Sequence, residues 1–182
     1  MKFLLFLLLL TPFMSVNAQT FYTETGSTKF TSSVPLHDFT GTSENLVGQI
    51  DLNENTIDFY IDLETLDTGN AKRDKDMLLT LETKQYPFAE FFGKLTSDFD
   101  LNSSLSQVVV VKGLFKIHGN EKEIEVNGTL TKTSSGLQLN AAWTLLLEDY
   151  NIVPPKLLFI KVDQEQKIEI NALLTEVKIE GN

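Results

Sequence analysis

One stretch of strict alternation constrains the fold of this chain more than any other. The eight residues Thr56–Leu63 place apolar and polar side chains in turn, with Ile57, Phe59, Ile61 and Leu63 at the apolar positions. Successive side chains of a strand point to opposite faces, so this pattern is typical of a strand with one buried and one solvated face. Asn53-Glu54-Asn55 precedes the stretch and resembles a hairpin turn. The segment therefore predicts one half of an antiparallel hairpin.

Similar runs recur along the rest of the chain. The clearest are Val108–Ile117, Glu123–Thr133, Leu137–Leu147 and Lys167–Leu174, and weaker ones are Phe21–Thr25, Lys29–Val34, Leu36–Phe39, Thr42–Leu52, Ala89–Phe99 and Glu176–Ile179. Short strands at a spacing of roughly 8–12 residues indicate an all-β sandwich or antiparallel barrel. Strands of similar length joined by tight turns favour the barrel, because closure removes the exposed edges. A barrel of about eight strands either fills with side chains or holds one small ligand.

The stretch from Leu63 to Phe92 interrupts the strands. Its turn, Asp67-Thr68-Gly69-Asn70, leads into a predicted helix over Ala71–Leu81 with Asp74, Met77, Leu78 and Leu81 on one face. Tyr86-Pro87 ends the helical stretch, since proline disfavours helical geometry in the residue before it. Phe88, Phe91 and Phe92 follow where the chain extends again. We expect this short helix to close one end of the barrel.

The first residues of the chain predict an export signal. Met1–Ala18 contains the apolar run Phe3–Leu10 and ends with small residues at Val16 and Ala18, typical of a cleavage site before Gln19. The run is shorter than the roughly 20 residues that cross a bilayer, although an uncleaved N-terminal anchor is the alternative. We expect residues 1–18 to be removed and residues 19–182 to form the barrel domain. The chain contains no cysteine, which excludes a disulfide and a lipid-modified N-terminal cysteine.

The charge of the chain argues against two classes of partner. Removing Lys2 with the signal leaves 14 basic and 25 acidic residues, a net charge of −11. An acidic surface disfavours nucleic acid and anionic membranes. The expected location is the periplasm or the exterior of the cell.

The polar residues predict neither catalysis nor metal binding. Asp62, Asp67, Asp74 and Asp76 lack the D-x-D-x-D-G spacing of a calcium loop, and His37 and His118 stand far apart without a third ligand. No G-x-S-x-G nucleophile motif occurs. An enzyme would also need a polar group of perturbed pKa among the inward positions, which are apolar in the best strands. We expect no catalytic residue, no metal and no cofactor.

A longer motif resembles that of a known family. The run from Leu66-Asp67-Thr68-Gly69-Asn70 through Arg73-Asp74 and Met77 to Tyr86-Pro87 and Phe91 is similar to the signature of the YceI-like family, DTGN-x-x-RD-x-H-[LM] followed by YP-x-x-x-F. Phe39-Thr40-Gly41, Gly113–Gly119 and Asp149-Tyr150 resemble further elements of that family. One departure is Asp76, which stands where many members have histidine, so a role of that imidazole does not transfer.

The resemblance implies a fold and a function. It implies a lipocalin-like, eight-stranded antiparallel barrel with a short helix near the mouth. Members of the family are secreted or periplasmic proteins, not generally described as enzymes, that bind long isoprenoid chains in an elongated apolar cavity, and they differ in ligand. The expected partner is therefore an isoprenoid or another long apolar lipid, and a homodimer is left open.

The inward positions supply the candidate binding residues. Periodicity by itself favours a core filled by side chains, as in a structural or protein-interaction barrel, whereas the resemblance favours a cavity. The residues predicted to line that cavity or its entrance are Ile57, Phe59, Ile61, Met77, Leu78, Phe88, Phe91, Phe92, Val109, Val111, Phe115, Trp143, Leu145 and Leu147. Asp67, Thr68, Gly69, Asn70, Arg73, Asp74, Tyr86 and Pro87 are predicted to hold the motif together, with Arg73 and Asp74 alternatively forming a polar pair at the mouth.

Overall fold

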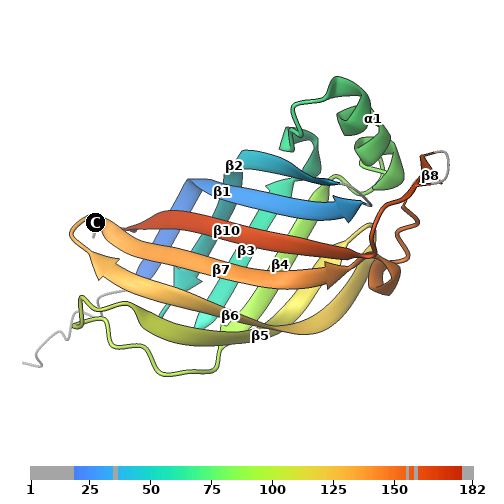
Figure 1. The fold of residues 1–182 in the computed structure, drawn as a ribbon. Coiled ribbons are helices and arrows are strands. Elements are labelled where there is room, and N and C mark those ends of the chain that lie inside the picture. The colour runs from blue at the N-terminus through green and yellow to red at the C-terminus, as the bar shows by residue number, and fades with distance from the viewer. Residues whose placement is uncertain (1–18, 35–36, 155, 158–159, 178–182) are drawn as a thin grey trace, which may run out of the picture.

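The computed structural model describes residues 19–34, 37–154, 156–157 and 160–177. Eight strands form a closed antiparallel barrel in the order β1-β10-β7-β6-β5-β4-β3-β2 (Figure 1). Their bounds are β1 (Thr20–Val34), β2 (His37–Asp51), β3 (Thr56–Asp62), β4 (Phe88–Leu95), β5 (Gln107–Ile117), β6 (Asn120–Thr133), β7 (Gly136–Leu146) and β10 (Glu165–Glu176). The predicted all-β, eight-stranded barrel is confirmed. The predicted signal, residues 1–18, lies outside the described residues.

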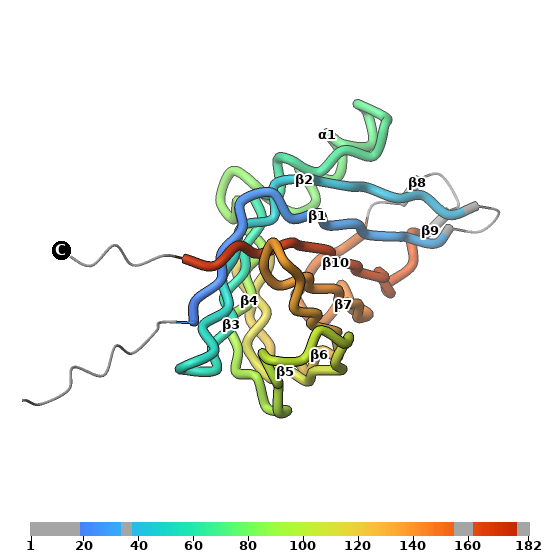
Figure 2. Tube along the Cα trace, turned by 90° about the vertical axis from the view of Figure 1, so that its left-hand side faces the viewer, coloured from blue at the N-terminus to red at the C-terminus, as the bar shows by residue number. Residues whose placement is uncertain are grey.

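The remaining elements gather at one end of the barrel. They are the helix α1 (Ala71–Thr80), the short 3-10 helices η1 (Leu63–Thr65) and η2 (Leu147–Tyr150), and the small hairpin of β8 (Lys156–Leu157) and β9 (Ile160–Lys161). Figures 1 and 2 both show α1 next to β2, where Thr42 and Asp67 form a backbone bridge. The described chain begins and ends at the opposite end of the barrel, where the Val177 N–H donates to the Thr20 carbonyl. Within the described residues, no helix is long and apolar enough to cross a membrane.

Two strands are longer than the sequence pattern predicts. The breaks expected near Gly26 and at Thr40-Gly41 are not breaks, because β1 and β2 each continue for 15 residues, whereas the break expected at Pro35 does fall between these two strands. The register of β1 against β2 shifts on both sides of Gly26, and such bulges bend a strand without ending it. A Cβ on Gly26 would lie 3.0 Å from the Ala172 Cβ, so the missing side chain also lets β10 approach the bend closely.

The end of the barrel away from α1 is packed solid. Its core consists of side chains that are at most 1% exposed, namely Phe21, Ile50, Val109, Leu130, Leu137 and Leu174. Phe21 pairs with Ile50, and Leu137 pairs with Leu174. These packed side chains close this end and leave the other end as the route to the interior.

Candidate functional site

A cavity of about 490 Å³ lies inside the barrel, under α1. This volume is within the range of small-molecule sites, roughly 300–1,000 Å³. Ten of the fourteen predicted binding residues line it, namely Ile57, Phe59, Ile61, Met77, Phe91, Val111, Phe115, Trp143, Leu145 and Leu147. The packed residues at the far end do not line it. The interior is therefore a blind apolar cavity rather than a through channel.

Four predicted residues lie elsewhere, each for a geometric reason. Phe88 and Phe92 are 41% and 55% exposed on the outer face of β4, because Ala89 and Phe91 take the inward phase of that strand. Val109 belongs to the packed end, below the floor of the cavity. Leu78 follows Met77 on α1, where successive side chains are rotated by about 100°, and it does not line the cavity.

The structure adds lining residues that the sequence reasoning did not select. From the bent strands come Phe30 and Phe39, whose rings meet edge to face with centroids 6.1 Å apart. From β10 come Ile168 and Ile170, which pair with Trp143 and Ala141 of β7. The alternation of β10 was visible in the sequence and could have identified its two isoleucines. Phe30 and Phe39 gave no such signal, because their strands read as short broken pieces.

The predicted structural motif fastens α1 over the mouth. The Asn70 side chain caps the helix by accepting hydrogen bonds from the backbone N–H groups of Lys72 and Arg73. One oxygen of Asp74 accepts from the Thr68 N–H at 3.0 Å and from the Thr68 hydroxyl at 2.6 Å. Asp67 accepts from the Gly69 N–H and also pairs through its backbone with Thr42 of β2. These contacts give Asp74 the pinning role that the motif predicted.

Arg73 contacts the barrel in a different way, through an aromatic ring of β2. Its guanidinium lies 4.6 Å from the centre of the Phe39 ring, and the residue lines the cavity together with Lys72 and Asp76. A guanidinium over an aromatic face is attracted by the ring quadrupole. The charged lining residues of α1 therefore form a polar rim above an apolar interior.

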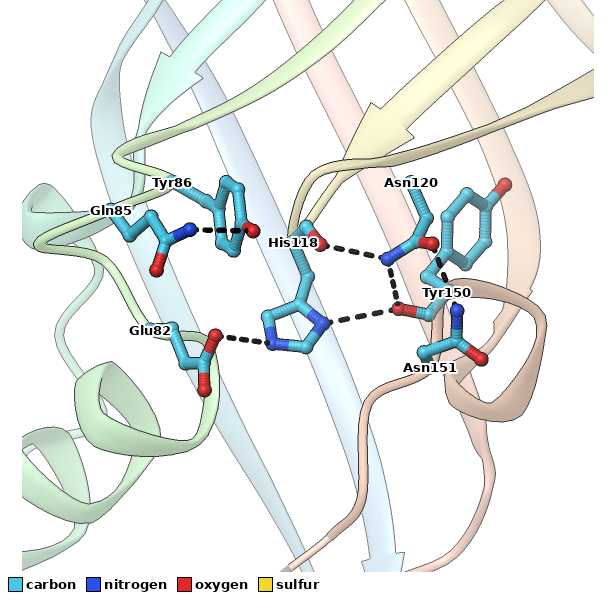
Figure 3. A network of polar contacts seen from close by, with 7 residues as sticks. All are labelled: Glu82, Gln85, Tyr86, His118, Asn120, Tyr150 and Asn151. Carbon is cyan, nitrogen blue, oxygen red and sulfur yellow. Dashed lines mark hydrogen bonds and ion pairs between the residues drawn. The ribbon is translucent and has the colours of Figure 1, made fainter.

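A polar network ties the helical end to two neighbouring turns (Figure 3). His118, in the β5–β6 turn, contacts the Tyr150 carbonyl through Nδ1 at 3.1 Å and the Glu82 carboxylate through Nε2 at 3.4 Å. The Asn120 amide donates to the carbonyls of His118 and Tyr150 and accepts from Asn151. The segment after α1, the β5–β6 turn and η2 are thereby held as one unit.

Aromatic packing extends the same unit into the cavity. The Tyr86 ring stands edge to face with His118, and the Phe115 ring does so with both Trp143 and Tyr150, with centroids 5.5–5.8 Å apart. Tyr150 is 2% exposed. Burial, with a smaller contribution from the nearby Asp149 charge, raises the pKa of Tyr150 to about 12. Tyr150 is therefore an uncharged buried residue at neutral pH, packed against the lining residue Phe115.

Among the described residues, no cluster of His, Asp and Glu side chains could hold a metal ion. The four aspartates that we considered have separate positions. Asp62 accepts from the Glu64 N–H, and Asp67 and Asp74 serve the turn before α1. Asp76 lines the rim of the cavity. The chemistry of the site is therefore that of an apolar interior under a charged rim.

A family model described as the YceI-like domain matches residues 19–174. The chain belongs to the YceI-like family. This membership confirms the resemblance inferred from the motif, and the match covers every strand of the barrel except the last two residues of β10. A comparison with curated proteins found no match.

Solved structures share the fold of this YceI-like chain at low sequence identity. A polyisoprenoid-binding domain from Saccharophagus degradans, implicated in plant cell wall breakdown, has 16% identity and a TM-score of 0.74 over 88% of this chain and 99% of its own. BcnA from Burkholderia cenocepacia has 15% identity and a TM-score of 0.68 over 84% and 96%. The Campylobacter jejuni YceI protein has 16% identity and a TM-score of 0.57 over 74% and 81%. At these identities, the likeness concerns the fold.

Proposed function

We propose that this protein is a secreted or periplasmic binding protein that sequesters or carries one long apolar lipid, an isoprenoid, inside the barrel. The observation that carries the proposal is the blind apolar cavity, closed at one end by packed core residues and reached under α1. The polyisoprenoid-binding domain of similar fold supports the same ligand class. The predicted signal, residues 1–18, supports the location.

Hydrophobic burial is sufficient to retain such a ligand. Each buried methylene releases about 0.8 kcal/mol, so ten buried carbons release roughly 8 kcal/mol before the costs of ordering, the free energy of a micromolar complex. Retention thus requires no ion pair. Met77 at the rim and the aromatic side chains of the wall can repack around a flexible branched chain.

The cavity favours binding over the alternative of a barrel filled by its own side chains, which would serve a structural or protein-interaction role. A catalytic role would need a titratable group directed at the ligand. The charged lining residues are Lys72, Arg73 and Asp76 of α1, at the rim, and Glu90 of β4, whose carboxylate is paired with Lys116. We therefore propose no reaction for this site.

Mass spectrometry tests the proposal directly. The protein is purified from its native host without detergent and extracted with organic solvent, and we expect one or a few long-chain lipids at a fixed molar ratio. In parallel, a polyprenyl quinone is titrated into delipidated protein. Trp143, the single tryptophan of the chain, lines the cavity and should change its emission on binding. Protein that carries no lipid from its host and binds no polyprenyl quinone at micromolar concentration would contradict the proposal.

A further inference from the structure

Three polar atoms of the cavity wall have no hydrogen-bond partner among the residues that the structure describes. They are the hydroxyl oxygens of Thr28 and Ser32 and the indole nitrogen of Trp143, and each is itself buried. All three residues line the cavity, and Ser32 is fully buried. A buried polar group without a partner costs about 1–3 kcal/mol. Three such groups in one apolar cavity indicate a ligand that supplies partners.

The three atoms belong to one wall. Thr28 and Ser32 occupy inward positions four residues apart on β1, with Phe30 between them. Ile168 of β10 pairs with both Phe30 and Trp143, so the indole lies at the level between the two hydroxyls. The facing wall, from β3 to β6, presents the apolar side chains of Ile57, Phe59, Phe91, Val111 and Val126. The cavity is therefore apolar on one side and carries a polar stripe on the other.

The chemistry of the stripe restricts the ligand. An indole N–H only donates, so its partner must be an acceptor, whereas hydroxyl groups can donate or accept. The charged lining residues are Lys72, Arg73 and Asp76 of α1, at the rim, and Glu90 of β4, so none of them belongs to β1, β10 or β7. An anionic group at the stripe would be buried without a counter-charge, which is costly. The fitting partner is an uncharged oxygen.

We propose that the bound lipid carries an uncharged acceptor oxygen, of carbonyl type, which lies inside the barrel and accepts from the Trp143 indole N–H, near one of the two β1 hydroxyls, while the hydrocarbon chain fills the facing wall. This proposal rests on the proposed function, since it concerns the same cavity. It adds the class of the polar group and its position within the barrel. A free carboxylate or phosphate would lie instead at the rim, beside Lys72 and Arg73.

A competition between matched probes tests the stripe. Pristane is a saturated isoprenoid hydrocarbon, and phytone is the methyl ketone in which a carbonyl oxygen replaces one branch methyl of pristane. Pristanic acid supplies the anionic form. The delipidated protein is equilibrated with all three probes delivered from cyclodextrin, separated and extracted, and the retained ratios are corrected for each probe's free concentration. We expect phytone to be retained about tenfold more tightly than pristane.

Single-residue variants test which polar side-chain atoms cause the preference for phytone over pristane. Thr28→Val, Ser32→Ala and Trp143→Phe each remove one polar atom. Trp143→Phe should lower the ratio of phytone to pristane by about two- to tenfold, the range for one neutral hydrogen bond. Thr28 and Ser32 lie about 13 Å apart along β1, too far for one oxygen to contact both, so only one of their two variants should lower the ratio. Thr31→Val, at an outward position of the same strand, should leave the ratio unchanged. Retention of pristane reports in every variant that the cavity is folded.

The outcomes separate the two proposals. Equal retention of pristane and phytone by the wild-type protein, or a ratio that Trp143→Phe preserves, would overturn the polar stripe and leave the carrier function standing. Preferential retention of pristanic acid would place the polar group at the rim and overturn the stripe as well. If none of the three probes binds, the carrier function fails and the stripe with it.

Discussion

The Thr68 hydroxyl donates to the Asp74 carboxylate at 2.6 Å, and the Thr68 backbone N–H donates to the same oxygen at 3.0 Å. The two bonds fasten the first turn of α1 to the segment that leads out of β3. None of the α1 side chains is fully buried, although Met77 packs against the core, so the position of the helix depends in part on such polar contacts at its ends.

Replacing Asp74 with alanine should loosen the helix. Hydrogen bonds to a charged group contribute about 1.5–3 kcal/mol when buried, and this partly exposed pair should contribute less, so we expect a loss of about 1–2 kcal/mol in the free energy of unfolding. Urea unfolding measures the change. Asp76→Ala, on the same helix, removes a side chain that has no hydrogen bond to the described residues and serves as the control. Equal losses in both variants would contradict the pinning role of Asp74.

Gly119 and Gly69 form a matched pair for the contact with Tyr86. Both have positive φ, +71° and +72°, but a Cβ on Gly119 would lie 2.5 Å from the Tyr86 ring, whereas one on Gly69 would meet nothing within 4 Å. Alanine at a left-handed position costs about 1–2 kcal/mol. We expect Gly69→Ala to lose about that much stability and Gly119→Ala clearly more, as measured by thermal unfolding. Equal losses would show that the Tyr86 ring moves aside freely.

Two neighbouring alanines of β7 face opposite sides of the barrel wall and so provide a matched pair of variants. Ala141 lines the cavity, while Ala142 is exposed. Ala141→Phe should fill part of the cavity and weaken polyprenyl quinone binding by at least tenfold. Ala142→Phe should leave binding unchanged, because its side chain points outward. Binding is followed by extraction and mass spectrometry of the retained lipid, and weakening by both variants alike would place the ligand elsewhere.

The raised pKa of Tyr150 leads us to expect a lower free energy of unfolding at alkaline pH. Burial raises its pKa to about 12, above the usual value of 10, so the folded protein holds this proton after the unfolded chain has released it. Stability from this group is fully present below pH 10 and is lost as the pH rises from 10 towards 12. Tyr150→Phe should remove this part of the alkaline loss in urea unfolding measured at several pH values. The control is Tyr60→Phe at an exposed position, and a wild-type slope in the Tyr150 variant would contradict the assignment.

The patterns that sequence reasoning used well are local. The alternation in Thr56–Leu63 predicted a strand whose inward residues Ile57, Phe59 and Ile61 do line the cavity. The turn and proline signals predicted a helix over Ala71–Leu81, and α1 spans Ala71–Thr80. Such features depend on the backbone preferences of individual residues and on the spacing of apolar side chains along the chain. Both are encoded by residues that are close together in the sequence.

The residues wrongly predicted to line the cavity depend on two features that a local pattern does not specify. One is which face of the strand points inward, and the other is how far along the barrel axis a residue lies. The run Phe88–Phe92 offers an aromatic residue in either phase, and only pairing with β3 and β5 decides that Phe91 faces inward. Val109 and Val111 share a face of β5, yet one lies in the packed end and the other lines the cavity. Depth along the barrel is set by residues of distant strands, such as Phe21 and Leu174, which a local pattern does not include.

The sequence by itself determined that this chain forms alternating strands with one short helix, and its motif determined the family. Only the tertiary structure decided that one end of the barrel is solid and the other hollow. The reason is that a cavity is the space left over when side chains from all eight strands meet, and no single segment specifies how far they reach.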